Sequence, residues 1–216
     1  MRKRLVQPAL RPYAPAAGRS RRVGRWVSAL LALTLSLPAP SLAGSLTFAT
    51  APTLPTLTSV TLNASAQTVD TTMTNFAVSD TRTGEKGWNV TAQGQSGTKK
   101  SAVFAQYCPK AKCGAAVEGY IAAGKKLAAD SLTLNSTGAT LTGGTHATPS
   151  LQCAAGCSLD NATAVKVLSA TTSEGTWTTS GFSATSLALA VPTTVSALPS
   201  EEVYHVNILW TLATGP

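Results

Sequence analysis

Charged and aromatic side chains are scarce in this chain of 216 residues, at 12% and 6% of the sequence. Long hydrophobic runs are also absent: the longest, residues 26–37, has 12 residues, and a helix that crosses a bilayer needs about 20. With 44% hydrophobic residues, the composition excludes a disordered tail protein and a multi-span membrane protein, and it fits one globular domain.

The formal net charge of +8 is concentrated at one end of the chain. Eight of the 17 lysines and arginines lie in the first 25 residues, which contain no acid, and from Gly44 onward nine basic residues face nine acidic ones. A neutral body has no electrostatic footprint for nucleic acid, so we expect no nucleic-acid partner.

Residues 1–43 have the pattern of a secretory signal peptide. The basic region ends at Arg25, the apolar run 26–37 follows, prolines interrupt it, and small residues precede a cleavage site after Ala43. The pattern predicts export by the general secretory or the twin-arginine route. An N-terminal membrane anchor is the alternative. We therefore expect an extracellular or cell-surface protein with no stable membrane insertion.

The remaining chain is typical of an all-β protein. Residues 44–56 are predicted to form a Pro/Thr-rich extended leader, and residues 57–216 a domain. Ser and Thr are abundant, and the helix candidate 115–129 is interrupted by glycines, so at most a short helix is expected there. Short alternating runs predict an antiparallel β-sandwich of about 7–9 strands. Such runs lie near residues 60–62, 76–79, 88–92, 132–134, 165–167, 187–191 and 204–212.

The four cysteines follow the predicted cleavage site and fall into two close pairs. These are Cys108 with Cys113 and Cys153 with Cys157. In an exported protein they predict two disulfides in a loop region, and turn-forming residues inside each pair favour local pairing over crossed pairing. A zinc site made by both pairs is a further alternative, although neither spacing is the tight two-residue one.

Patterns that carry catalysis are missing or isolated. His146 and His205 have no second ligand at metal-binding spacing. Ser96-Gly-Thr-Lys99 matches the S-x-x-K pattern of penicillin-recognising enzymes but lacks its partner motifs. The carboxylates are scattered, so they do not suggest glycoside hydrolysis. We therefore expect no enzymatic activity, no cofactor and no metal.

Two halves of the chain resemble WxL-domain proteins of the bacterial cell surface. In the first half, Phe76-Ala-Val-Ser-Asp80-Thr-Arg82 leads through a glycine turn into Trp88-Asn-Val90. In the second half, a Leu-Ala-Leu-Ala-Val-Pro strand ends at Pro192, and Trp210-Thr-Leu212 closes the pattern. The first motif has Val90 in place of leucine, and the middle of the chain, about 101–160, carries the cysteines and departs from the family pattern.

The resemblance implies an exported, non-catalytic domain that associates non-covalently with the cell wall, with peptidoglycan or another wall polymer as partner. The alternative is a structural or assembly protein that binds other proteins of the cell surface. Residues two apart on a strand share one face, so Trp88, Val90, Trp210 and Leu212 either fill the core or bind wall sugars, and core packing is favoured. Trp177 has polar neighbours in the sequence and is the candidate for an exposed aromatic contact.

Overall fold

The computed structural model describes residues 44–84 and 86–216. The predicted signal peptide, residues 1–43, lies outside the described residues. The described residues form one compact unit. No helix in the described part of this unit is long and apolar enough to cross a membrane.

The predicted all-β class is confirmed, with more strands than expected. The described residues contain 15 short strands and a single four-residue helix. In chain order they are β1 Leu46–Thr50, β2 Gln67–Thr71, β3 Ala77–Asp80, β4 Trp88–Gly94, β5 Ala105–Cys108, α1 Lys110–Cys113, β6 Gly119–Tyr120, β7 Leu132–Leu134, β8 Thr140–His146, β9 Ser150–Leu151, β10 Cys157–Ser158, β11 Val165–Ala170, β12 Ser173–Ser180, β13 Leu187–Val191, β14 Val203–His205 and β15 Ile208–Thr214.

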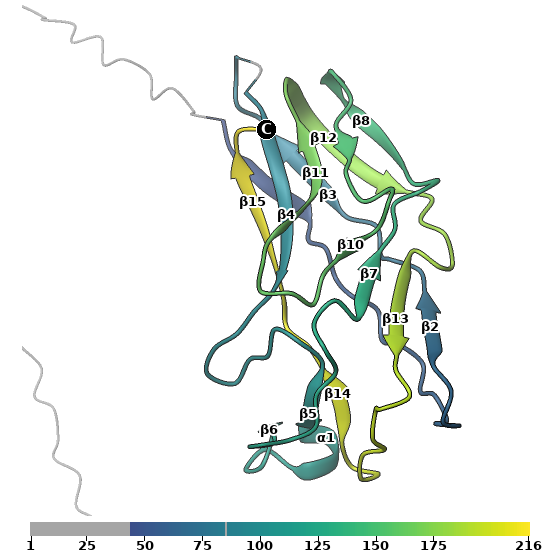
Figure 1. Ribbon diagram of the computed structural model, residues 1–216. Helices are drawn as coiled ribbons and strands as arrows, with labels where there is room; N and C mark the ends of the chain where they lie inside the picture. Colours follow the sequence, from purple (N-terminus) through teal and green to yellow (C-terminus); the bar gives the residue numbers. More distant parts are fainter. Residues whose placement is uncertain (1–43, 85) are drawn as a thin grey trace, which may run out of the picture. The chain divides into compact units, whose positions relative to one another are not determined.

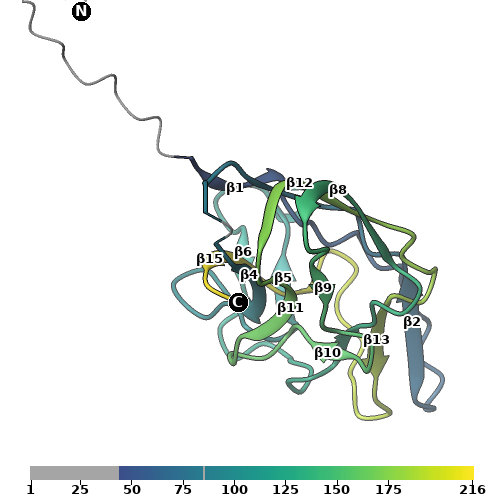
Figure 2. The same ribbon diagram turned by 90° about the horizontal axis from the view of Figure 1, so that it is seen from above.

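The strands form four antiparallel sheets. The first sheet has the order β1-β3-β12-β8, the second β10-β7-β13-β2, the third β15-β4-β11-β9 and the fourth β14-β5-β6. The first and third sheets make the two layers of a sandwich, and the second and fourth continue it at the lower end of the view (Figure 1). Seen from above, β1, β12 and β8 run along one side, and β15, β4 and β11 along the other (Figure 2).

One hydrophobic core joins the sheets. Its fully buried side chains come from the first sheet (Val78), the third (Trp88, Val90, Leu168) and the second (Leu134). A row of aromatic rings closes the contact between layers: the centroid of Phe76 lies 6.5 Å from that of Phe182 and 6.2 Å from that of Trp210. The alternation of buried and half-buried residues along β4 therefore follows directly from its period-two sequence.

The structure differs from the sequence-based prediction in three segments. Part of the predicted leader forms strand β1, which pairs with β3 inside the first sheet. The strand expected near residues 60–62 is absent, since that stretch has no regular secondary structure. The expected last strand is two strands, β14 and β15, separated at Val206 and Asn207, where Asn207 bonds to the backbone of Ser101 instead of continuing a ladder.

Both disulfides pair neighbouring cysteines, as predicted. Cys108 is bonded to Cys113 across helix α1, and Cys153 to Cys157. All four cysteines are thereby used, so neither the crossed pairing nor the zinc alternative holds. Cys153 is fully buried in the core cluster, whereas Cys108, although buried, lies outside that cluster at the end of β5, where it pairs with Gly119 of the fourth sheet.

Removing the Cys153–Cys157 bridge by a double Cys→Ala change is expected to lower the free energy of unfolding by about 2 kcal/mol from loop closure, with a further loss because Cys153 packs in the core. Urea unfolding of the oxidised proteins measures this loss. The matched change at Cys108 and Cys113 should cost less, and an equal or larger loss there would contradict this account.

Candidate functional site

The two tryptophan motifs lie on neighbouring strands of the third sheet. Strand β15 pairs antiparallel with β4 so that Leu212 lies opposite Val90, Trp210 opposite Ala92 and Thr214 opposite Trp88. All four motif side chains therefore point to one face, with the two indoles at opposite ends, about 13 Å apart along the strand. The two motifs, which are some 120 residues apart in the sequence, thus form one continuous apolar surface.

That surface faces the core. Trp88 and Val90 are completely buried, and Trp210 and Leu212 are partly buried and pack on the same cluster. The indole N–H of Trp88 has no hydrogen-bond partner among the described residues. Trp88 and Val90 consequently act as packing residues, and Trp210 is the motif indole with an exposed part.

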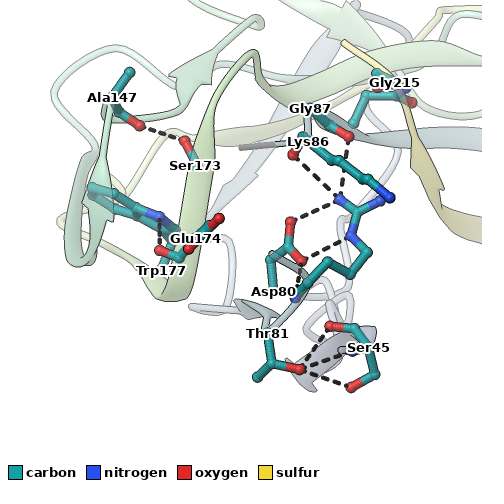
Figure 3. Close-up of polar contacts among 12 residues, drawn as sticks. Ser45, Asp80, Thr81, Lys86, Gly87, Ala147, Ser173, Glu174, Trp177 and Gly215 are labelled. Atoms are coloured by element: carbon teal, nitrogen blue, oxygen red, sulfur yellow. Dashed lines mark hydrogen bonds and ion pairs between the residues drawn. The ribbon is translucent and has the colours of Figure 1, made fainter. Parts of the chain in front are cut away.

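Trp177 is not exposed, so the expectation of an exposed aromatic contact there was wrong. Its side chain is 5% exposed, and its Nε1 donates to the carbonyl oxygen of Glu174 at 3.1 Å (Figure 3). Gly144 on the neighbouring strand β8 makes room for the ring, because a Cβ at that position would come within 2.1 Å of the indole. Its two polar neighbours, Thr176 and Thr178, lie on the outward face of β12, whereas Thr179 is buried like Trp177 itself.

An ion pair between Asp80 and Arg82 holds the turn that carries the chain from the first sheet to the third. Arg82 Nε donates to Asp80 Oδ1 at 2.8 Å and its Nη2 to Oδ2 at 2.7 Å. The same Nη2 donates to the carbonyl oxygen of Gly87 at 3.2 Å, and Gly215 N–H donates to that oxygen at 2.9 Å (Figure 3). We call the Asp80–Arg82 pair and its bond to the carbonyl oxygen of Gly87 the clamp. It fixes the chain just before Trp88 and the end of β15 together.

The charge of Asp80 depends on this clamp. Burial of the carboxylate would raise its pKa, but hydrogen bonds from the side chain and backbone of Arg82, together with the charges of Arg82 and Lys86, outweigh burial and lower the pKa below its ordinary 3.8. The guanidinium pKa of Arg82 is raised in turn by its bond to Asp80. The pair is ionised at neutral pH and shields a carboxylate that is only 1% exposed.

The exposed part of Trp210 borders a cleft. This cleft has a volume of about 270 Å³ and lies between residues 52–54 and residues 205–208. Pro52, Leu54 and Ile208 give it apolar walls, and Asn207 and His205 bring amide and imidazole groups to it. It combines an indole with polar groups on one partly open surface.

A cluster of three aromatic rings adjoins this cleft through His205. Tyr107 from β5 lies 5.0 Å from Tyr120 of β6, edge to face, and 4.8 Å from His205 of β14, measured between ring centroids. All three side chains are partly exposed. The fourth sheet thus brings His205 next to two tyrosines that lie 85 or more residues before it in the sequence, beside the Cys108–Cys113 bridge.

Hydrogen bonds orient the polar atoms of this cluster. Asn207 Oδ1 accepts from Ser101 N–H at 3.1 Å and from Tyr120 O–H at 2.6 Å. Because Tyr120 has only one proton to donate, the 2.6 Å contact with His205 Nδ1 requires that nitrogen to be the donor. Burial lowers the pKa of His205, and burial together with the nearby Tyr107 raises the pKa of Tyr120 to about 12, so both rings are neutral at physiological pH.

Sequence reasoning missed Tyr107, Tyr120 and the role of His205. Tyr107 and Tyr120 lie in the middle segment that departs from the family pattern, and the only local signal was their position beside a cysteine loop. Among residues 44–84 and 86–216, no group of three or more His, Cys, Asp or Glu side chains could hold a metal ion. The arrangement consists of aromatic faces and hydrogen-bonded polar groups on one partly exposed surface.

The packing role of the first motif predicts a large loss of stability when Trp88 is removed. Trp88→Ala is expected to lower the free energy of unfolding by about 3–5 kcal/mol, since a fully buried indole leaves a cavity. Chemical denaturation measures the effect. Leu209→Ala, on the exposed side of β15, should change it by less than about 0.5 kcal/mol; equal effects would contradict a core role for Trp88.

The clamp predicts a characteristic pH dependence. Because the folded pKa of Asp80 is lowered, its contribution is complete above the unfolded pKa of about 4 and is lost as the pH falls through the folded value. Arg82→Ala should cost about 3–5 kcal/mol at neutral pH, since it leaves a buried carboxylate unpaired. Without Arg82, burial raises the pKa of Asp80, so the variant should gain stability relative to wild type as the pH falls below neutrality. Urea unfolding from pH 7 to pH 3 measures both curves, and parallel curves would contradict the clamp.

Comparison with known proteins adds a family to this geometry. No curated protein and no solved structure matches the chain. The model of one family, described as the WxL domain, a surface cell wall-binding domain, matches residues 35–216. The match covers nearly the whole chain and includes both strands of the paired motif, and the chain therefore belongs to the WxL domain family of cell wall-binding surface proteins.

Proposed function

We propose that this WxL protein is exported and cleaved after Ala43, that it has no catalytic activity, and that it binds peptidoglycan non-covalently. The contact surface in this proposal is the wall-binding face, defined as the cleft beside Trp210 together with the ring cluster Tyr107, Tyr120 and His205. The disulfide pairing supports export, because such bonds persist in oxidising compartments.

The observation that carries the proposal is the juxtaposition of partly exposed aromatic rings with a cleft of fixed polar groups. Aromatic rings present an apolar face and, in tyrosine, a polar tip, which suits sugars with apolar ring faces and polar edges. Asn207 and His205 belong to both parts of the face, since they line the cleft and bond to Tyr120. The motif residues Trp88, Val90 and Leu212 serve the proposal by shaping the sheet that carries Trp210.

The lack of catalysis in the proposal is supported by how the carboxylates are used. Asp80 is bonded to Arg82, Asp160 accepts the backbone N–H groups of Ser131 and Leu132, and Glu202 accepts from Gln106. Glu118 accepts from the hydroxyl of Tyr107. Each of these four carboxylates has a hydrogen-bond partner within the protein, which supports a structural role for it.

Sedimentation with protein-free peptidoglycan sacculi tests the proposal. Residues 44–216 should sediment with the sacculi, and Tyr107→Ala should weaken binding about tenfold because it removes the ring shared by both contacts of the cluster. Tyr107→Phe keeps that ring and loses only the bond to Glu118, so it is the matched control and should bind nearly as wild type.

Two results would contradict parts of this proposal. Equal sedimentation of wild type and a folded Tyr107→Ala variant would remove the ring cluster from the binding face. No sedimentation of wild type would remove peptidoglycan as the partner and would favour other proteins of the cell surface.

A further inference from the structure

A second, larger cavity lies beneath the second sheet. It has a volume of about 950 Å³ and lies, partly open to solvent, between that sheet and two covering segments, residues 54–62 and 195–206. Leu187, Leu189 and Val191 of β13 line it, with Val69 of β2 and Leu132 of β7. Residues at every second position of β13 line it, so its apolar floor extends over about 13 Å.

The first covering segment, residues 54–62, has polar contacts at its ends, and between them it is held by apolar packing against the core. Leu54, Leu57 and Val60 are turned inward at a spacing of three residues, which is the period of polyproline II and not of a strand. No backbone group of residues 54–60 bonds to the backbone of another described residue. At the ends, Thr53 bonds to Thr74, and Gln67 Nε2 donates to the carbonyl oxygen of Thr61 at 3.0 Å.

The second covering segment is tied down by polar contacts. Lys125 Nζ donates to the carbonyl oxygen of Ala197 at 2.6 Å, and Tyr204 O–H to that of Ser196 at 2.9 Å. Glu202 accepts from Gln106. Moving the segment 54–62 aside breaks no backbone–backbone hydrogen bond of residues 54–60, so it is the more easily displaced side of the cavity. Displacement breaks the bond from Gln67 to Thr61 and the apolar packing of Leu57 and Val60.

The chemistry of the walls decides what can fill this space. An apolar cavity costs more free energy the larger its volume, and a water molecule inside needs two to four polar partners. Among the lining side chains, Glu202, Tyr204 and His205 already have hydrogen-bond partners. The other polar lining side chains are hydroxyl groups, and all of them belong to the two covering segments: Thr56, Thr58, Ser59, Thr61, Ser196 and Ser200. The floor on the second sheet is apolar and therefore favours a hydrocarbon over water.

We infer that the cavity binds one linear hydrocarbon chain that carries a polar head. The chain lies along β13 beneath residues 54–62. The head lies where Leu54, His205 and Val206 line both this cavity and the cleft beside Trp210, so that the polar groups of the cleft face it. The volume falls within the 300–1,000 Å³ usual for small-molecule sites. This inference goes beyond wall binding and does not depend on it.

Fluorescence titration with 11-(dansylamino)undecanoic acid tests the inference on residues 44–216. One probe should bind per chain, with its emission shifted to the blue, and native mass spectrometry checks the stoichiometry. Leu189→Trp fills the cavity from the floor, and Leu57→Trp fills it from the first covering segment, residues 54–62. Each should weaken probe binding at least tenfold. Leu209→Trp makes the same change on the exposed face of β15 and should leave it unchanged.

Two competitors, lauric acid and a single-chain lysophosphatidylglycerol, distinguish a free fatty acid from a membrane lipid as the source of the chain. Displacement of the probe by either supports the inference, and the stronger competitor identifies the preferred head. The inference is overturned if the probe fails to saturate on wild type, if neither competitor displaces it, or if the folded Leu57→Trp variant binds it as wild type does. Unfolding curves of each variant establish that it is folded.

Discussion

The Asp80–Arg82 pair is the contact on which the two layers of this sandwich depend. A charged pair with so little solvent access is stabilising only when its remaining hydrogen-bonding groups are satisfied, and here the guanidinium also serves backbone carbonyl groups of the turn. Because one of these oxygens is shared with Gly215 N–H, the end of β3, the start of β4 and the end of β15 meet at a single point. Both motif strands are therefore positioned from the same clamp.

The tryptophan motifs that characterise the family contribute mainly to the hydrophobic core. A strand places residues two apart on one face, and the antiparallel register puts Val90 against Leu212. This geometry turns two short sequence signatures into one wall of the core and leaves a single indole, Trp210, with part of its surface open. The motif thus acts as a scaffold, and any contact with a partner depends on the rings and polar groups arranged around that scaffold.

Local patterns in the sequence were enough for the class of fold, the disulfide pairing and several strands. Trp88–Ala92 and Leu187–Val191 alternate cleanly, so their burial follows from the period of a strand. At residues 60–62 the same reasoning failed, because Val60 and Leu62 alternate with a polar residue, yet this stretch has no regular secondary structure.

The features that could not be predicted are those made by segments far apart in the sequence. Trp177 is buried because of Gly144, on a strand 33 residues before it, which provides the room for its ring. The ring cluster joins Tyr107, Tyr120 and His205 from three different strands. No local sequence pattern predicts that these residues contact one another, since each of them has neighbours typical of a solvated loop or strand.

The local pairing of the cysteines also affects how the native disulfides form during folding. Each cysteine is bonded to its nearest neighbour in the sequence, four or five residues away. The native pair is then also the pair that collides most often in an unfolded chain. A polypeptide that becomes available for folding in the order of its sequence meets each correct partner before any competing cysteine arrives, so the native pairs can form without a later exchange of disulfides.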